Sequence, residues 1–294
     1  KLLFYSLLSI VCTATALPDL QQKPRKKKAE DERITLKHAD NLRFNKYEMN
    51  GAQRFSGNVV MSHAGMTMNC DSAVYYEQSQ TFDAFGNVKI VQGDTLTLTG
   101  EKLHYDGETQ IAEMRHKVVM THREQKLFTD SLNYDRPYNV GYYFDGGRLK
   151  DGKNDLNSDW GEYHTDTRRA TFNYNVELIT PKFRLITDTL HYDTQTKWAE
   201  VVGASNIYSG EDRMYTEHGF YNSEKDSVRL FKNTQAFGKD RVMTGDTVYY
   251  DKKSGIMEAH RNVSCLDLKN KNCLTGHYAW YNELTGEALA TDSA

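Results

Sequence analysis

Asp188-Thr-Leu-His-Tyr-Asp193 and Asp246-Thr-Val-Tyr-Tyr-Asp251 are two copies of the short pattern that decides the fold. In each copy an acidic residue begins the segment, and an apolar residue lies two positions before a tyrosine. Side chains alternate between the two faces of a β-strand, so the apolar residue and the tyrosine share one face. The pattern therefore predicts a strand with one buried face, followed by a turn that the final aspartate begins.

The tyrosine of this pattern recurs along the chain at intervals of 29 to 31 residues. These anchor tyrosines are Tyr75, Tyr105, Tyr134, Tyr163, Tyr192, Tyr221, Tyr250 and Tyr281, and Phe44 stands one interval before them. A fixed period of this size is typical of proteins whose repeats bury their apolar faces by stacking on their neighbours. We predict one elongated stack of about nine antiparallel β repeats of 29 residues.

Each repeat carries three further signals. A turn sequence such as Asp106-Gly-Glu-Thr109 follows the anchor. A small or apolar residue, for example Ala112, stands seven positions after the anchor, and an Asn-Val pair such as Asn87-Val88 stands about 13 positions after it and begins another alternating segment. We interpret each repeat as about four short strands joined by tight turns, and we expect almost no helix.

The interval between Tyr134 and Tyr163 departs from this spelling. Several aromatic residues precede Asp145-Gly-Gly147, and a polar run follows them. This interval is expected to carry either a longer loop or a kink.

Length and composition favour a single thin body. The 294 residues are enough for one or two domains, but the period is unbroken. Hydrophobic residues make up 38% of the chain and aromatic residues 12%, a balance expected of a β structure with much surface per residue. The formal net charge of −3 argues against a nucleic-acid partner.

Residues 1–16 resemble a secretory signal peptide. An apolar run from Leu2 to Val11 precedes Ala14-Thr-Ala16, which has the form of a cleavage site. The run is shorter than the roughly 20 residues of a membrane-spanning helix, which disfavours a membrane anchor. Residues 17–34 form a basic and acidic linker that is either solvated or in contact with anionic lipid headgroups. We predict periplasmic export through a cleaved signal peptide, with residues 35–294 as the β-repeat domain.

The cysteines and histidines of the sequence are better explained by structural roles than by catalysis or metal binding. In an exported protein Cys265 and Cys273, on either side of a predicted turn, are placed for a cross-strand disulfide, which leaves Cys70 as a buried free thiol. His104 and His191 precede anchor tyrosines and are expected on the exposed face. No cofactor motif and no metal-ligand spacing of histidines occurs in the sequence.

Two sets of carboxylates are candidate sites. Asp155-Leu-Asn-Ser-Asp159 has the spacing that begins a calcium loop, but it lacks the glycine and glutamate that complete one, so a polar loop is the preferred interpretation. The acids that begin the anchor segments suggest paired glycosidase carboxylates. Their recurrence in most repeats is better explained by strand-end geometry, and we predict no catalytic residues.

The regular recurrence of these short segments resembles the repeats of a known family. Residues 57–61 (Gly-Asn-Val-Val-Met) with 71–75, and 86–90 (Gly-Asn-Val-Lys-Ile) with 101–105, resemble repeats of the OstA-like family. The similarity extends over residues 36–288. The family includes the periplasmic bridge protein of lipopolysaccharide transport and the periplasmic domain of its outer-membrane translocon.

The resemblance implies an open β-jelly roll whose apolar interior holds the acyl chains of lipopolysaccharide or lipid A, with end-to-end strand pairing to other jelly-roll components of a transport bridge or to a second copy. From alternation alone, the lipid-facing candidates are Val59, Met61, Met66, Met68, Val88, Ile90, Leu96, Leu98, Val118 and Met120. Flexible methionines suit varied acyl chains, and ordinary core packing explains the same residues.

Three functions remain open on the sequence. The first is a periplasmic, non-enzymatic lipid carrier, located in the periplasm or at the outer membrane. The second is a structural or adhesive β-repeat protein of the cell surface, which predicts a dry, fully packed interior. The third is a glycan-cleaving enzyme, which predicts that Asp155 and Asp159 in the irregular interval act together.

Overall fold

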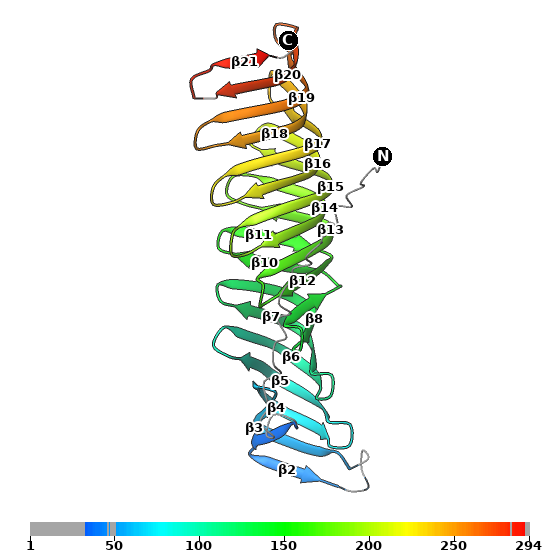
Figure 1. Cartoon of the computed structure of the whole chain (residues 1–294). Helices are drawn as coiled ribbons and strands as arrows, with labels where there is room; N and C mark the ends of the chain where they lie inside the picture. Colours follow the sequence, from blue (N-terminus) through cyan, green and yellow to red (C-terminus); the bar gives the residue numbers. More distant parts are fainter. Residues whose placement is uncertain (1–32, 46, 48–50, 283, 292–294) are drawn as a thin grey trace, which may run out of the picture.

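The computed structural model describes residues 33–45, 47, 51–282 and 284–291. Within these residues the protein is all-β, and the strands stack in chain order along one axis from β2 at one end to β21 at the other (Figure 1). This confirms the predicted elongated antiparallel architecture of an open β-jelly roll. The predicted signal peptide and most of the predicted linker lie outside the described residues, whereas Ile34, at the end of that linker, is buried in the core.

All neighbouring strands are antiparallel, and together they form one continuous ladder. The strands are β1 Thr35–His38, β2 Asn41–Phe44, β3 Gln53–His63, β4 Met66–Tyr76, β5 Thr81–Gln92, β6 Leu96–Asp106, β7 Ile111–His122, β8 Gln125–Asp135, β9 Val140–Tyr143, β10 Gly147–Asp151, β11 Asn154–Ser158, β12 Trp160–His164, β13 Arg169–Ile179, β14 Arg184–Asp193, β15 Trp198–Ser209, β16 Asp212–Asn222, β17 Ser227–Phe237, β18 Arg241–Asp251, β19 Ile256–Asp267, β20 Asn272–Asn282 and β21 Ala288–Thr291.

Each regular repeat holds two long strands, and the prediction of about four short strands was wrong. β5 and β6, for example, pair from Thr81↔Asp106 to Gln92↔Leu96 with one register shift between Phe85 and Val88. The Asn-Val pair therefore marks a β-bulge inside one strand instead of the start of another. A bulge bends a strand and leaves the ladder intact on both sides, so alternation alone could not distinguish one bent strand from two short ones.

A repeated hydrogen bond explains the bulge. Asn87 adopts a left-handed conformation with φ of 45°, and its side-chain amide donates to the Asp71 carboxylate at 2.9 Å. The preceding Gly86 has φ of 74°, and a Cβ there would lie 2.3 Å from that carboxylate. The same Asn-to-acid bond joins Asn58 to Asp40, Asn175 to Asp159, Asn233 to Glu217 and Asn262 to Asp246. The recurring acids thus serve strand geometry, as predicted.

These bulges divide the roll into two layers that meet at corners. We call the strand segments that carry the anchor tyrosines the anchor layer, and the segments beyond the bulges the opposite layer. The side of the roll away from the corners is where the strand ends and turns of the two layers face each other. We call this side the mouth.

In the anchor layer, large and small side chains alternate from strand to strand. Tyr105 pairs with Ala112, Ala112 with Tyr134, Tyr134 with Gly141, and Gly141 with Tyr163. The small residues Ala112 and Gly141, each seven positions after an anchor, leave room for the rings on both sides, because directly paired residues have Cβ atoms only about 5 Å apart. Phe44, the ninth anchor, is instead 58% exposed because β2 lies at the end of the stack.

The irregular interval contains a kink, and of the two expected features the longer loop is not found. β9 and β10 occupy the place of one long strand, and β11 and β12 occupy the place of the next. Their pairing to β8, with Tyr134↔Gly141 and Thr129↔Gly147, keeps the spacing of the regular repeats. The strands break at the corner, where Gly146 has φ of 86°.

Candidate functional site

A single row of apolar side chains follows the inner face of the opposite layer along the whole stack. Each member pairs directly with the next across neighbouring strands: Leu36, Met61, Met68, Ile90, Leu98, Met120, Leu127, Leu149, Leu156, Leu178, Leu185, Ile207, Met214, Ala236, Met243, Cys265 and Leu274. We call this the inner row. Its backbone groups are engaged in the sheet, so the row presents only apolar side chains to the interior.

The first part of the interior is closed. All ten residues predicted to face lipid lie on the inner side of the roll and are 0–4% exposed. They pack in one core cluster with the anchor tyrosines from Tyr75 to Tyr221. In this conformation they are core residues, and lipid contact through them stays a prediction.

The last part of the interior is more open. Leu185 is 1% exposed, whereas the inner-row members Ile207, Met214 and Met243 are only half-buried against the core and Leu274 is 48% exposed. The anchors follow the same trend, because Tyr250 is half-buried. An apolar surface that is continuous with the core therefore becomes accessible from β15 onward.

Hydrogen bonds from the anchor hydroxyls cross the mouth in the closed part. The Tyr105 hydroxyl lies 2.7 Å from Nδ1 of His63, and the Tyr134 hydroxyl donates to Oε1 of Gln92 at 3.1 Å. His63 and Gln92 each lie at the end of an opposite-layer strand, two residues after an inner-row member. These bonds join the two layers at the ends where they would otherwise separate.

The next two bonds continue this series. The Tyr163 hydroxyl lies 2.8 Å from Nδ1 of His122, and the Tyr192 hydroxyl donates to Asp151 at 2.6 Å. Burial comes first among the causes that raise the pKa of Tyr105, Tyr163 and Tyr192, so these hydroxyls stay protonated and able to donate.

Asp151 is the centre of the strongest polar cluster in the interior. Its carboxylate is 4% exposed and accepts from Nζ of Lys197 at 2.6 and 2.7 Å, besides the Tyr192 hydroxyl. Nε2 of Gln125 donates to it at 3.1 Å. A buried carboxylate needs such partners because transfer from water without them is very costly.

Beyond Tyr192 the contacts across the mouth change in kind. Tyr221 packs edge-on against Phe183 with ring centroids 4.2 Å apart. Its hydroxyl donates at 3.3 Å to Asp226 of the neighbouring turn, and Asp226 in turn forms an ion pair with Lys182 at 2.6 Å. In the last repeat the guanidinium of Arg241 lies 5.6 Å from the centroid of the Tyr281 ring.

The predicted disulfide is not formed. Cys265 pairs with Leu274 and Cys273 pairs with Leu266, so the two cysteines lie on opposite faces of the β19–β20 hairpin, and both are free. Counting residues to the turn missed the register by one, which moves a side chain to the other face. Cys70 is a buried free thiol, as predicted, and burial raises its pKa to about 11.

The other sequence candidates take structural roles. Asp155 lies in strand β11 and not in the predicted polar loop, and it is bound by Arg148, while Asp159 accepts from Asn175. In the part of the chain that the structure describes, no group of three or more His, Cys, Asp or Glu is placed to hold a metal ion. His104 and His191 are exposed, as expected.

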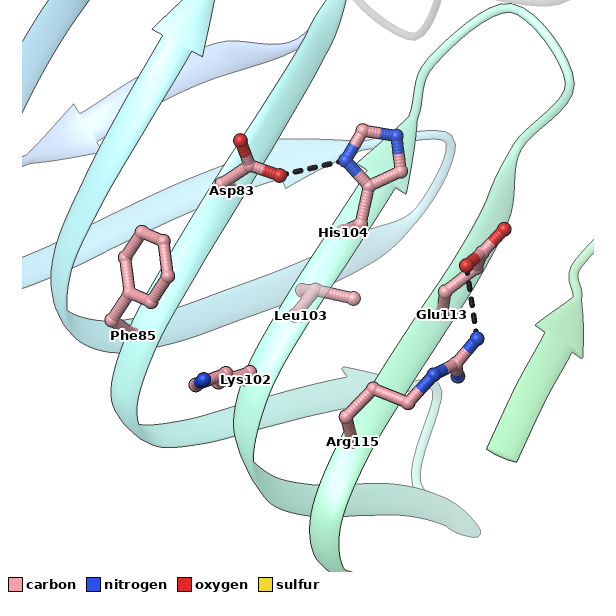
Figure 2. A pocket seen from close by; sticks show the side chains of 7 residues that line it. All are labelled: Asp83, Phe85, Lys102, Leu103, His104, Glu113 and Arg115. Atoms are coloured by element: carbon pink, nitrogen blue, oxygen red, sulfur yellow. Dashed lines mark hydrogen bonds and ion pairs between the residues drawn. The ribbon is translucent and has the colours of Figure 1, made fainter. Parts of the chain in front are cut away.

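A shallow hollow of about 200 Å³ lies on the outer face of β5 to β7 (Figure 2). His104 contacts Asp83 at 2.7 Å, and Arg115 contacts Glu113 at 2.9 Å. Phe85, 41% exposed, forms its apolar wall. The His104–Asp83 pair joins β6 to β5 and the Arg115–Glu113 pair lies within β7, so ion pairing accounts for these four groups, and the interior is the better candidate site.

A family model described as OstA-like protein matches residues 31–188, more than half of the chain. The chain belongs to the OstA-like family. Sequence resemblance had predicted this family from the repeated Asn-Val and anchor segments. The open part of the interior, from Ile207 onward, lies after the matched residues, and the same 29-residue period continues through it.

Among solved structures, the chain is similar to LptH of Pseudomonas aeruginosa, described as the LptA-homologous periplasmic component of the lipopolysaccharide transport device. The TM-score is 0.35 and the sequence identity 16%, over 37% of this chain and 82% of that one. No curated protein matches the chain significantly. In the described residues no helix is long and apolar enough to cross a membrane.

Sequence reasoning missed the acceptors across the mouth. His63, Gln92, His122 and Asp151 recur with the anchor period, which is the signal that could have found them, but their chemical types differ. Tyr143, fully buried against Ser158 in the irregular interval, was missed for a different reason, because it lies outside the anchor series.

Proposed function

We propose that this OstA-like protein is a non-enzymatic, periplasmic lipid-binding protein of lipopolysaccharide transport, and that acyl chains occupy its apolar interior. The observation that carries the proposal is the inner row, an unbroken apolar track that becomes accessible from Ile207 to Leu274. An acyl chain has no polar groups to satisfy, so it suits a surface whose backbone hydrogen bonds are already made within the sheet. Membership of the OstA-like family agrees with this proposal.

The ends of the stack suit pairing with another chain. Within the described residues, the segment of β20 before His277 pairs with β19 alone, and β1 and β2 are short, exposed strands at the other end. Exposed strand edges accept further strands. We propose that jelly-roll components of a bridge, or a second copy of the chain, add at these edges.

Photo-crosslinking tests the lipid proposal. A benzophenone amino acid replaces Met243 on the inner row or, as the matched control, Leu266, which is 37% exposed and lies next to the inner-row residue Cys265. With purified lipopolysaccharide we expect a crosslinked adduct at position 243 and little at position 266. Equal labelling at both positions, or none at either, would contradict the proposal.

A structural β-repeat protein of the cell surface is the second candidate, and one observation favours it. The first part of the interior is as tightly packed as that function predicts, with Met61, Ile90 and Met120 at most 1% exposed. The protein can be purified from a Gram-negative envelope and tested for bound lipid and for location. If it carries no lipid and lies outside the outer membrane, the second function is favoured over lipid transport.

A further inference from the structure

The contacts across the mouth coincide with the state of the interior behind them. Where anchor hydroxyls bond to His63, Gln92, His122 and Asp151, the inner row is closed. In the repeats that follow Tyr192, the inner row is half-buried and finally exposed. We propose that these four bonds are latches that regulate how far an acyl chain can enter the roll.

This inference rests on the function proposed above and concerns the same interior. The closed part has a lining of Met61, Met68 and Met120, whose unbranched side chains can rearrange around a guest. It offers no room while the two layers remain latched, because core residues there are essentially unexposed. A chain that enters the open part must therefore separate the layers, latch by latch, to advance toward β3.

The latches differ in strength along the stack. The Tyr105 and Tyr163 hydroxyls bond to imidazoles, and the Tyr134 hydroxyl bonds to an amide. A bond of this kind makes only a small net contribution because water replaces it when it breaks. The Asp151 carboxylate accepts from three donors that act as one network, and one of them, Lys197, is its partner in a buried ion pair. The Asp151 latch is the last of the hydroxyl latches along the chain, and the inner row stays buried through Leu185 and becomes half-buried at Ile207.

Opening a latch exposes little polar surface that water cannot satisfy. The hydroxyls and their acceptors lie at strand ends, beside the turns, where solvent reaches them once the layers part. The main cost is the apolar area of the inner row, and an acyl chain that covers this area offsets it. The latches are therefore suited to open for an amphiphile and to close after it leaves.

Cys70 is a native reporter of the closed part, because its buried thiol lies on the inner side beside Val59. In a background with Cys265→Ser and Cys273→Ser, N-ethylmaleimide alkylates only this thiol among the described cysteines. Tyr105→Phe with Tyr134→Phe removes two latch hydroxyls and keeps both rings. We expect Cys70 to react at least about fivefold faster than in the background, in line with the loss of net hydrogen bonds.

Tyr142→Phe is the matched control. It also removes one hydroxyl with a hydrogen bond, from Asn133 at 3.4 Å, but it lies on the other side of the sheet from the anchors. The Cys70 rate of this variant should equal that of the background. Equal rates in the latch variant and the control, with unchanged circular dichroism, would overturn the latch proposal. If the double variant fails to fold, Tyr134→Phe alone is measured against the same control and criterion.

A second readout separates this inference from the proposed function. A diazirine-bearing palmitic acid is photolysed with each variant, and labelled peptides are mapped. Labelling confined to residues after Tyr192 in the background, and extended to β3–β8 in the latch variant, supports both proposals. A faster Cys70 reaction without any labelling leaves the latches established and the lipid function rejected, whereas labelling of β3–β8 already in the background rejects the latches.

Discussion

Lys197 and Lys117 each form a 2.6 Å ion pair with a carboxylate, but in very different surroundings. The side chains of Lys197 and Asp151 are 20% and 3% exposed, whereas those of Lys117 and Glu101 are 83% and 48% exposed. An exposed pair is screened by water and contributes little, while loss of one partner from a buried pair leaves an uncompensated charge. Burial, more than distance, decides what each pair does.

We predict that Lys197→Met lowers the free energy of unfolding by about 3–5 kcal/mol because the Asp151 carboxylate stays buried without its cation. Lys117→Met, the matched control, should leave it almost unchanged, because the exposed pair is screened by water. Urea denaturation measures both. The double variant Lys197→Met with Asp151→Asn should recover part of the loss, and equal effects of the two single Lys→Met changes would contradict the assignment.

At the scale of the element, the bulge is what turns a strand into two layers. Asn87 combines a left-handed backbone with a side-chain bond to Asp71 across the corner. Asparagine and aspartate adopt this left-handed conformation more readily than most other residues that carry a side chain. The Asn-Val spelling therefore encodes a bend in the strand, with the acid 16 residues earlier as its partner.

Asn87→Ala should lower stability by about 1–2 kcal/mol, since it removes the bond to Asp71 and places a Cβ-bearing residue without compensation in the left-handed region. Asn87→Gly separates the two effects because glycine accepts the backbone conformation and loses only the amide. We expect the glycine variant to be the more stable of the two in thermal and urea unfolding. The reverse order would show that backbone strain at the corner is unimportant.

At the scale of the whole molecule, buried tyrosines connect the repeats and respond to alkaline pH as a group. Burial comes first among the causes that raise the pKa of Tyr143 to about 12 and that raise the pKa of Tyr105, Tyr192 and Tyr221. A group whose folded pKa exceeds its unfolded value stabilises the fold below the unfolded pKa, near 10, and loses this contribution as pH rises toward the folded pKa.

We therefore expect the free energy of unfolding to be nearly constant between about pH 8 and 9 and to fall steeply above about pH 10. Tyr143→Phe should reduce the slope of this fall, because one tyrosine that resists ionisation is removed. Tyr138→Phe is the control, since Tyr138 is 73% exposed. Urea titrations at several alkaline pH values test this expectation, and an identical slope for the two variants would contradict it.

The sequence by itself determined the repeat period, the all-β class, the antiparallel stacking, the family and the inner faces of the strands. Each of these depends on local alternation and on spacing, which are visible in one chain. The number of strands in a repeat was not determined, because a bulge bends a strand without a break in the alternation on either side. The disulfide between Cys265 and Cys273 failed for a related reason, since a shift of one residue in register exchanges the faces.

Only the tertiary structure decided which parts of the interior are open. The inner row has similar residue types from Met61 to Met243, yet its exposure depends on contacts between side chains about 41 residues apart, such as Tyr192 and Asp151. Those contacts form between layers, and the partners of the anchor hydroxyls are in turn an imidazole, an amide, an imidazole and a carboxylate, so no single residue type predicts them. The repeated sequence specifies which strand pairs with which. The separation of the two layers depends on the side-chain contacts across the mouth, which only the folded structure brings together.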